Sequence, residues 1–124
     1  MNENLFKLVK KEPLTVCFDA ILPNDLCWFR GHFKKQPLLP GVIQLLWAQK
    51  LATQYLFTKE HSLIGVPTVK FMKPLIPSDK IRLCLTLQCL NDKKTVKFEY
   101  LRQDGDSFTL SSSGKLNYKD QDCE

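Results

Sequence analysis

The sequence predicts an α+β protein in which a curved antiparallel sheet wraps around one long central helix. Residues 40–57 are the only long helix-like stretch, and the chain after it alternates between apolar and polar residues as strands do. Residues 14–21, before the helix, are also rich in strand-forming residues. A sheet that curves around the helix buries the apolar faces of both, so we expect this arrangement.

The helix is expected to begin at Pro40-Gly41, because the proline backbone is already set for a first helical turn. At about 100° per residue, most of the apolar side chains of the helix fall on one arc. They are Leu45, Ala48, Leu51, Ala52, Tyr55 and Leu56. Two residues break the pattern, since Gln44 lies inside the apolar arc and Leu46 lies on the polar side.

Strands are expected through the rest of the chain. Residues 65–72 look extended, and residues 81–89 alternate as a half-buried strand does. The alternation continues over residues 96–100, and Asp104-Gly105 is a strong hairpin signal. Residues 108–118 then alternate to near the end of the chain.

The chain is expected to form a single domain over residues 1–124, with a charged, disordered tail at residues 119–124. Residues 1–12 fit either a short edge strand or a turn of helix. No apolar run has the length of a signal peptide core or of a membrane span. We therefore expect a cytoplasmic protein without membrane insertion.

Charge and cysteine content exclude several classes of function. The net charge is +5 and the lysines are scattered, which argues against nucleic-acid binding and favours an acidic protein partner. The five cysteines are odd in number and form no Cys-x-x-Cys pair. This spacing argues against a zinc site and against a disulfide framework, and it is typical of reduced thiols.

His32 lies shortly before the expected helix N-terminus at Pro40-Gly41. Backbone amides in a first helical turn can polarise a carbonyl oxygen while an imidazole moves a proton. This combination favours carbonyl chemistry. Two structural alternatives stay open: His32 could serve only the loop structure, and Gly41 could relieve crowding where the helix passes under the sheet.

The same stretch resembles a known family. His32-Phe33, followed by residues 37–42 with the sequence Pro-Leu-Leu-Pro-Gly-Val, is similar to the H-F-P-x-x-P-x-x-P-G-V motif of the FabZ-like, hot-dog-fold 3-hydroxyacyl-carrier-protein dehydratases. Residues 69–79 resemble the family's K-F-x-x-P-(V/I)-x-P-G-D stretch. Within the family, the chain most resembles the short single-domain dehydratases of aryl-polyene-type pathways, partly because of Gln44 and Trp47-Ala48.

The resemblance implies a hot-dog fold and the dehydration of a 3-hydroxyacyl thioester of acyl carrier protein or coenzyme A. A histidine matching His32 removes the α-proton, and the amide matching Gly41 binds the thioester carbonyl. No metal or organic cofactor is implied, because the thioester itself acidifies the α-proton. The acyl chain lies at a dimer interface, which a second copy or a related hot-dog subunit forms. The residues expected to contact substrate are Phe33, Leu39, Pro40, Val42 and Leu46.

The sequence departs from the family at the catalytic acid. The family carries Asp or Glu on the central helix of the other subunit, where this chain has Leu46, and no Asp or Glu occurs between residues 31 and 59. Lys34 also replaces the proline after His-Phe. A neutral side chain cannot protonate a leaving hydroxide, and Gln49 or Lys50 would be poor substitutes.

The leading interpretation is a 3-hydroxyacyl-thioester dehydratase-like protein of fatty-acid or polyene-type biosynthesis. Its base is His32, and its carbonyl-binding group is the Gly41 amide. Two alternatives stay open. One is a catalytically impaired subunit that binds acyl chains or acyl carrier protein and pairs with an active homologue, which would supply the missing acid. The other is an acyl-thioester hydrolase.

Overall fold

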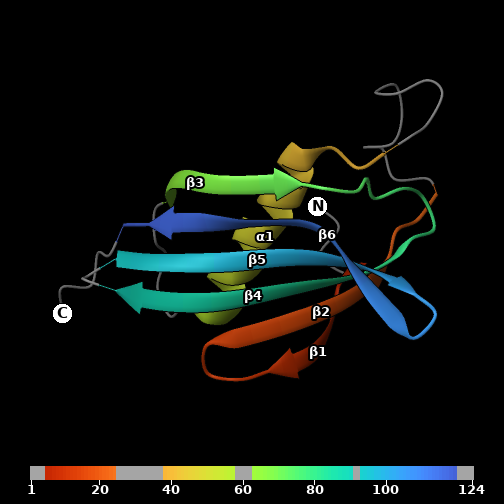
Figure 1. Ribbon diagram of the computed structural model, residues 1–124. Helices are drawn as coiled ribbons and strands as arrows, with labels where there is room; N and C mark the ends of the chain where they lie inside the picture. Colours follow the sequence, from red (N-terminus) through yellow and green to blue (C-terminus); the bar gives the residue numbers. More distant parts are fainter. Residues whose placement is uncertain (1–4, 25–37, 58–62, 91–92, 120–124) are drawn as a thin grey trace.

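The computed structural model describes residues 5–24, 38–57, 63–90 and 93–119. These contain one helix and six strands (Figure 1). In chain order they are β1 (Lys7–Lys11), β2 (Thr15–Ile21), α1 (Gly41–Leu56), β3 (Leu63–Phe71), β4 (Lys80–Leu90), β5 (Lys93–Asp104) and β6 (Ser107–Tyr118). The strands form one sheet in the order β1-β2-β4-β5-β6-β3, and every neighbouring pair is antiparallel.

The predicted α+β architecture is confirmed, with α1 lying across one face of the sheet (Figure 1). The N-terminal segment forms an edge strand rather than a helical turn, because β1 pairs with β2. The hairpin at Asp104-Gly105 is also confirmed: β5 ends at Asp104, and Gly105 takes a left-handed φ of 63° that glycine adopts without strain. Residues 120–124 of the expected tail lie outside the described residues.

The core lies between α1 and the sheet. Alternate residues of each central strand face the helix, such as Phe18 on β2 and Leu83 on β4, and both are fully buried. Trp47 is the largest buried side chain of the helix, and its ring meets that of Phe6 edge-on at 5.3 Å between centroids. This packing fixes the position of α1 against the sheet, and with it the place of the helix N-terminus.

A β-bulge interrupts β6. Tyr100 of β5 lies opposite Ser112, whereas the next residue, Leu101, lies opposite Leu110, so Ser111 is an extra residue. The expectation of one unbroken alternation over residues 108–118 is therefore wrong in one respect. Because of the extra residue, the even-numbered side chains after the bulge lie on the opposite face of the sheet from those before it. Phe108 accordingly lies on the outer face of the sheet, away from α1.

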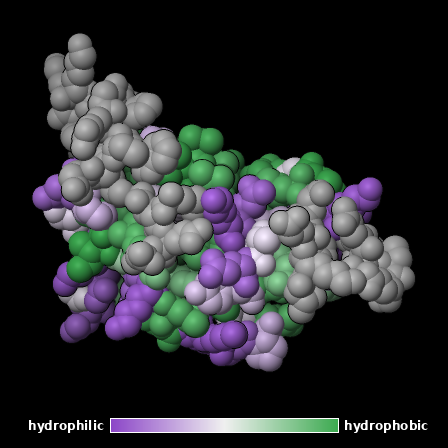
Figure 2. Space-filling model, turned by 180° about the vertical axis from the view of Figure 1, so that it is seen from behind, coloured by the Kyte–Doolittle hydropathy of each residue, from purple (hydrophilic) through white to green (hydrophobic). Residues whose placement is uncertain are grey.

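Apolar side chains are exposed along the edge of the sheet that β3 forms. We call Val42, Leu46, Ile64, Val69 and Phe71 the edge patch; the first two belong to α1 and the others to β3. Figure 2 shows hydrophobic surface along its upper rim, the side on which Figure 1 places β3. β3 pairs with β6 only, so its other backbone edge is unpaired by any described residue. The described part of the chain contains no helix of the length and apolarity that a membrane span requires.

Candidate active site at the N-terminus of the central helix

The N-terminus of α1 leaves two backbone amides without an acceptor among the described residues. Pro40 is the N-cap, in an extended conformation, and no side chain caps the helix. The amides of Ile43 and Gln44 donate to the Pro40 carbonyl oxygen at 3.1 and 3.3 Å. The amides that remain are those of Gly41 and Val42, which carry the partial positive charge of a helix N-terminus. Such amides can bind a carbonyl oxygen or an anion.

Phe71, the last residue of β3, covers Gly41. A Cβ atom built on Gly41 would lie 2.5 Å from Cζ of Phe71, well inside van der Waals contact. Only glycine therefore fits under the ring in this position. The crowding considered as a structural reason for Gly41 is real, and it comes from this one aromatic side chain.

A pocket of about 240 Å³ lies beside this contact. Leu38, Leu39, Gly41 and Gln44 line it from the helix side, and residues 71–74 line it from the end of β3 and the segment that follows. The predicted residues Leu39 and Gly41 thus meet in one hollow. None of the described residues that line this pocket is Asp or Glu.

Gln44 ties the first turn of α1 to the sheet. Its side-chain nitrogen donates to the Leu39 carbonyl oxygen at 3.3 Å, and its Oε1 accepts a 2.6 Å hydrogen bond from the Ser112 hydroxyl. The Tyr100 hydroxyl donates to the Gln44 backbone carbonyl at 2.6 Å. Burial raises the pKa of Tyr100 well above its ordinary value, so this donor stays protonated. Gln44 is thus a buried amide whose side-chain oxygen and nitrogen both have hydrogen-bond partners.

The bulge residue Ser111 holds the opposite wall of the pocket. Its hydroxyl donates to the Lys73 carbonyl oxygen at 2.6 Å, and its own carbonyl accepts the amides of Met72 and Lys73. Together with Ser112, which binds Gln44, two adjacent buried serines fix both walls. Neither serine is predicted from the sequence as part of the site. The signal was present as a run of three serines, residues 111–113, in a strand that faces the core.

The other predicted site residues are placed as follows. His32 and Phe33 lie outside the described residues. Pro40 is the N-cap of α1. Val42 and Leu46 lie one helical turn apart on the surface of α1, with exposed fractions of 68% and 37%, and neither lines the pocket. Leu46 is therefore on the exposed side of the helix, as its place in the periodicity predicts.

Several carboxylates elsewhere in the described residues have other partners. The Asp19 carboxylate forms a two-point ion pair with Arg82 at 2.6 and 2.9 Å, and Asp79 accepts the Ile76 amide at 2.9 Å. No group of three or more His, Cys, Asp or Glu side chains that could hold a metal ion occurs within the described residues. The described part of the chain thus brings no carboxylate to the Gly41 pocket.

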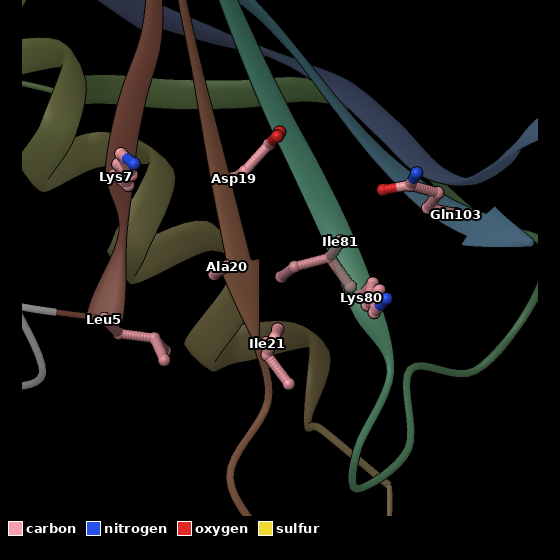
Figure 3. A pocket seen from close by; sticks show the side chains of 8 residues that line it. All are labelled: Leu5, Lys7, Asp19, Ala20, Ile21, Lys80, Ile81 and Gln103. Atoms are coloured by element: carbon pink, nitrogen blue, oxygen red, sulfur yellow. The ribbon is translucent and has the colours of Figure 1, made fainter. Parts of the chain in front are cut away.

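A second hollow of about 530 Å³ lies near the opposite edge of the sheet, where β1, β2 and β4 are neighbours. Figure 3 shows its lining side chains, including Asp19 and Ile21 of β2 and Lys80 of β4. Among the described residues it shares none with the Gly41 pocket, and the one carboxylate they bring to it is the Asp19 group already paired with Arg82. The two hollows are separate, and only the first contains residues that the sequence predicts for the site.

Comparison with known proteins first defines the class. One antiparallel sheet around one helix is the hot-dog fold, and the structure of the dehydratase heterocomplex ApeI:P from Xenorhabdus doucetiae has the same fold, with a TM-score of 0.78 and 28% identity over 91% of this chain and 94% of that one. The sequence model of the ApeI-like family, described as ApeI dehydratase, matches residues 8–115. The chain therefore belongs to the ApeI-like dehydratase family.

Two further proteins are similar to this chain. An uncharacterized protein from Erwinia carotovora subsp. atroseptica is 33% identical, with a TM-score of 0.73 over 89% of this chain and 87% of that one. The 3-hydroxyacyl-[acyl-carrier-protein] dehydratase FabZ of Histophilus somni is 38% identical over 68 residues, which are 48% of this chain and 44% of that protein. The chain spans less than half the length of the FabZ relatives it matches.

Thioesterases share the fold as well. Thioesterase superfamily member 2 from Mus musculus has a TM-score of 0.70 but only 13% identity, over 94% of this chain and 82% of that one. Identity this low shows the fold alone. The family assignment therefore rests on the ApeI-like match.

Proposed function

We propose that this chain is a subunit of a dehydratase that acts on 3-hydroxyacyl thioesters, with His32 as the base and the Gly41 amide as the group that binds the thioester carbonyl. The observation that supports it most directly is the pair of amides at the start of α1 that have no acceptor among the described residues, beside a pocket, in a chain of the ApeI-like dehydratase family. Fatty-acid or polyene-type biosynthesis in the cytoplasm is the setting we propose.

The chemistry divides into two proton transfers. The neutral His32 imidazole takes a proton from the α-carbon, while the Gly41 amide and the dipole of α1 stabilise the negative charge that develops on the thioester oxygen. The α,β-double bond then forms as the C3–O bond breaks. The departing hydroxyl needs a proton to leave as water, and Leu46 cannot donate one.

The missing acid is best supplied by a partner subunit. In the family that the sequence resembles, the acid comes from the central helix of the other subunit. A homodimer of this chain would place Leu46 in both sites, whereas a related subunit with Asp or Glu at that position would complete the site that contains His32. The Xenorhabdus doucetiae relative is a heterocomplex, which supports this form of the proposal.

The edge patch is the surface that we propose for this partner. β3 presents a backbone edge that no described residue pairs with, which is available to another strand, and the patch offers apolar side chains to bury. The patch also includes Leu46, so a subunit bound there would lie next to the position where the acid is missing. Such an interface would bring the two helices and the Gly41 pocket together.

We propose acyl carrier protein as the source of the thioester, with coenzyme A as the alternative. The chain has a net charge of +5, which complements an acidic protein carrier. Lys73 lines the Gly41 pocket and Lys70 lies three residues earlier on β3. We propose that these two cations attract a phosphate-bearing thioester arm.

The test is turnover of a 3-hydroxyacyl-carrier-protein thioester by the purified chain. The chain is assayed alone and with a related hot-dog subunit that carries Asp or Glu at the position of Leu46. We expect little activity alone, activity with the partner, and loss of that activity with His32→Ala. Leu46→Asp should create activity in the chain alone, and Leu46→Asn, which has a similar shape but no acidic proton, should not.

Two other outcomes would change the assignment. Release of free thiol from an acyl thioester that lacks a 3-hydroxyl group would indicate a hydrolase. If no variant shows dehydratase activity with any partner, although the acyl carrier protein binds measurably, the chain is a binding subunit and the dehydratase proposal is wrong.

A further inference from the structure

Cys17 and Cys84 lie directly opposite each other on adjacent strands, although 66 residues separate them in the sequence. The register of β2 and β4 makes them partners. Their neighbours along the strands, such as Phe18 and Leu83, face α1 and are fully buried, so the two cysteines face the outer side of the sheet. Both thiols are free in this structure.

The hydrogen bonds of the ladder show which residue pairs are bonded through their backbones. At one end, the Leu87 amide donates to the Leu14 carbonyl oxygen at 2.7 Å. At the other end, the Leu22 amide donates to the Asp79 carbonyl oxygen at 2.9 Å. Bonded and non-bonded pairs alternate along an antiparallel ladder. Because Leu14 and Leu22, which flank the two ends of β2, are in bonded pairs, the even-numbered residues between them are also in bonded pairs, and the odd-numbered residues are in non-bonded pairs.

Cys17 and Cys84 are therefore a non-hydrogen-bonded pair. In such pairs the Cα atoms are only about 4.5 Å apart and the side chains are close. That separation falls within the range that a disulfide bridges without movement of the backbone. The geometry of the ladder alone brings the two sulfur atoms within bonding reach.

The flanking pairs support this geometry. On one side, the Thr15 hydroxyl donates to that of Thr86 at 3.5 Å. On the other side, the Asp19 carboxylate binds Arg82 at 2.6 Å. Both are non-bonded pairs of the same ladder, and in both the side chains meet across the strands. The cysteine pair between them is under the same constraint.

The environment of the thiols agrees with direct contact between them. Burial, and after it a hydrogen bond shared with the Cys17 thiol, raise the pKa of Cys84 to about 12. The Cys84 thiol is consequently protonated near neutral pH, and its reaction with oxidants becomes faster as the pH rises. Cys84 is half-buried and Cys17 is buried, so an oxidant reaches Cys84 first.

We propose that Cys17 and Cys84 form a reversible intramolecular disulfide that links β2 to β4 when the protein meets a peroxide. One thiolate attacks the O–O bond of hydrogen peroxide, giving a sulfenic acid and, with one proton, water. The second thiol then attacks the sulfenic sulfur, the S–S bond forms, and the hydroxyl leaves as a second water. Two thiols and one hydrogen peroxide thus yield one disulfide and two waters, and a dithiol reductant reverses the change.

This cross-link would act on the stability of the fold and not on the Gly41 pocket, which neither cysteine lines. It closes the chain from residue 17 to residue 84, which includes α1. Closing so long a segment restricts the unfolded chain and stabilises the folded one. The inference does not depend on the proposed function.

The test uses a variant in which Cys27, Cys89 and Cys123 are serine, so that only this pair can close within one chain. The folded protein is treated with hydrogen peroxide near neutral pH and at about pH 9, then unfolded in denaturant, alkylated and analysed by mass spectrometry. We expect the loss of two hydrogens and no alkylation at either sulfur, with faster closure at the higher pH. Peptide mapping of the peroxide-treated wild type should identify the same linkage. Dithiothreitol should restore both thiols, and the oxidised form should have a Tm higher by roughly 5–15 °C.

The single changes Cys17→Ser and Cys84→Ser, each in that background, are the controls and should show no closure and no gain in Tm. The proposal is overturned if both thiols of the folded protein stay open to alkylation after peroxide treatment. It is also overturned if one sulfur is oxidised to the sulfinic acid while the other remains reduced, because that result means that the sulfur atoms do not meet.

Discussion

The ring of Phe71, at the end of β3, occupies the space that a side chain on Gly41, at the start of α1, would need. A Cβ atom on Gly41 would lie 2.5 Å from Cζ of Phe71. The contact joins the helix N-terminus to the strand that forms the edge of the sheet. It also explains why a residue that weakens a helix stands in the first helical turn. Two reasons for the glycine, a structural one and a catalytic one, meet at this position.

Substitutions at Gly41 and Phe71 distinguish the structural reason for the glycine from the catalytic one. Gly41→Ala should change stability by no more than about 1 kcal/mol, because the half-exposed Phe71 ring can turn aside and alanine favours the helix. Activity with the partner subunit should fall at least about tenfold, since backbone close to the thioester oxygen leaves no room for a methyl group. The measurements are urea unfolding and dehydratase turnover. If the double variant with Gly41→Ala and Phe71→Ala has full activity, Gly41 is needed only to leave space for the Phe71 ring.

Gln44 and Ser112 should be energetically coupled, because removing either side chain leaves the buried polar group of the other without its partner. Gln44→Leu leaves the buried Ser112 hydroxyl without its acceptor and should destabilise the protein by about 2–3 kcal/mol. Ser112→Ala should cost about 1–2 kcal/mol for the same reason. A double-mutant cycle measured by urea unfolding should give a coupling of about 1 kcal/mol. Strictly additive effects would show that the bond contributes nothing to holding the first turn of α1.

The helix and the strands could be predicted because their apolar periodicity follows directly from which face is buried. Gln44 and Leu46 were also informative, since each broke the pattern and each has a distinct place in the structure: one in a buried network, the other in the exposed edge patch. Pro40-Gly41 marked the start of the helix within one residue.

The bulge at Ser111 could not be predicted in the same way. Serine fits a buried or an exposed position, so one extra residue changes the face of the strand without disturbing the visible alternation. The contact of Phe71 with Gly41 and the pairing of Cys17 with Cys84 depend on the strand order. That order is a property of the whole sheet and leaves no local trace in the sequence.

Stability should decrease in alkaline solution. Burial raises the pKa of Tyr118 from its ordinary 10.0 to about 12. The unfolded chain therefore loses this proton before the folded one does, and the stabilisation present below pH 10 is lost as the pH rises towards 12. The loss from this group should be roughly 1–2 kcal/mol. Urea unfolding at a series of pH values should show a smaller decrease for Tyr118→Phe. Cys84 adds to the decrease in the same direction, because its pKa is raised to about 12 from 9.0.

The edge patch should control association through β3. Ile64→Lys places a charge on the patch and should weaken binding of the partner subunit, or of a second copy, by at least about tenfold, because burying an unpaired ammonium group is costly. Ile21→Lys is the matched control, since Ile21 has nearly the same exposed fraction, 58% against 61%, but lies on β2, away from β3. Sedimentation velocity of the chain, alone and with the partner, measures both variants. Equal weakening by the two lysines would mean that charge alone is responsible, and unchanged association of Ile64→Lys would place the interface elsewhere on the surface.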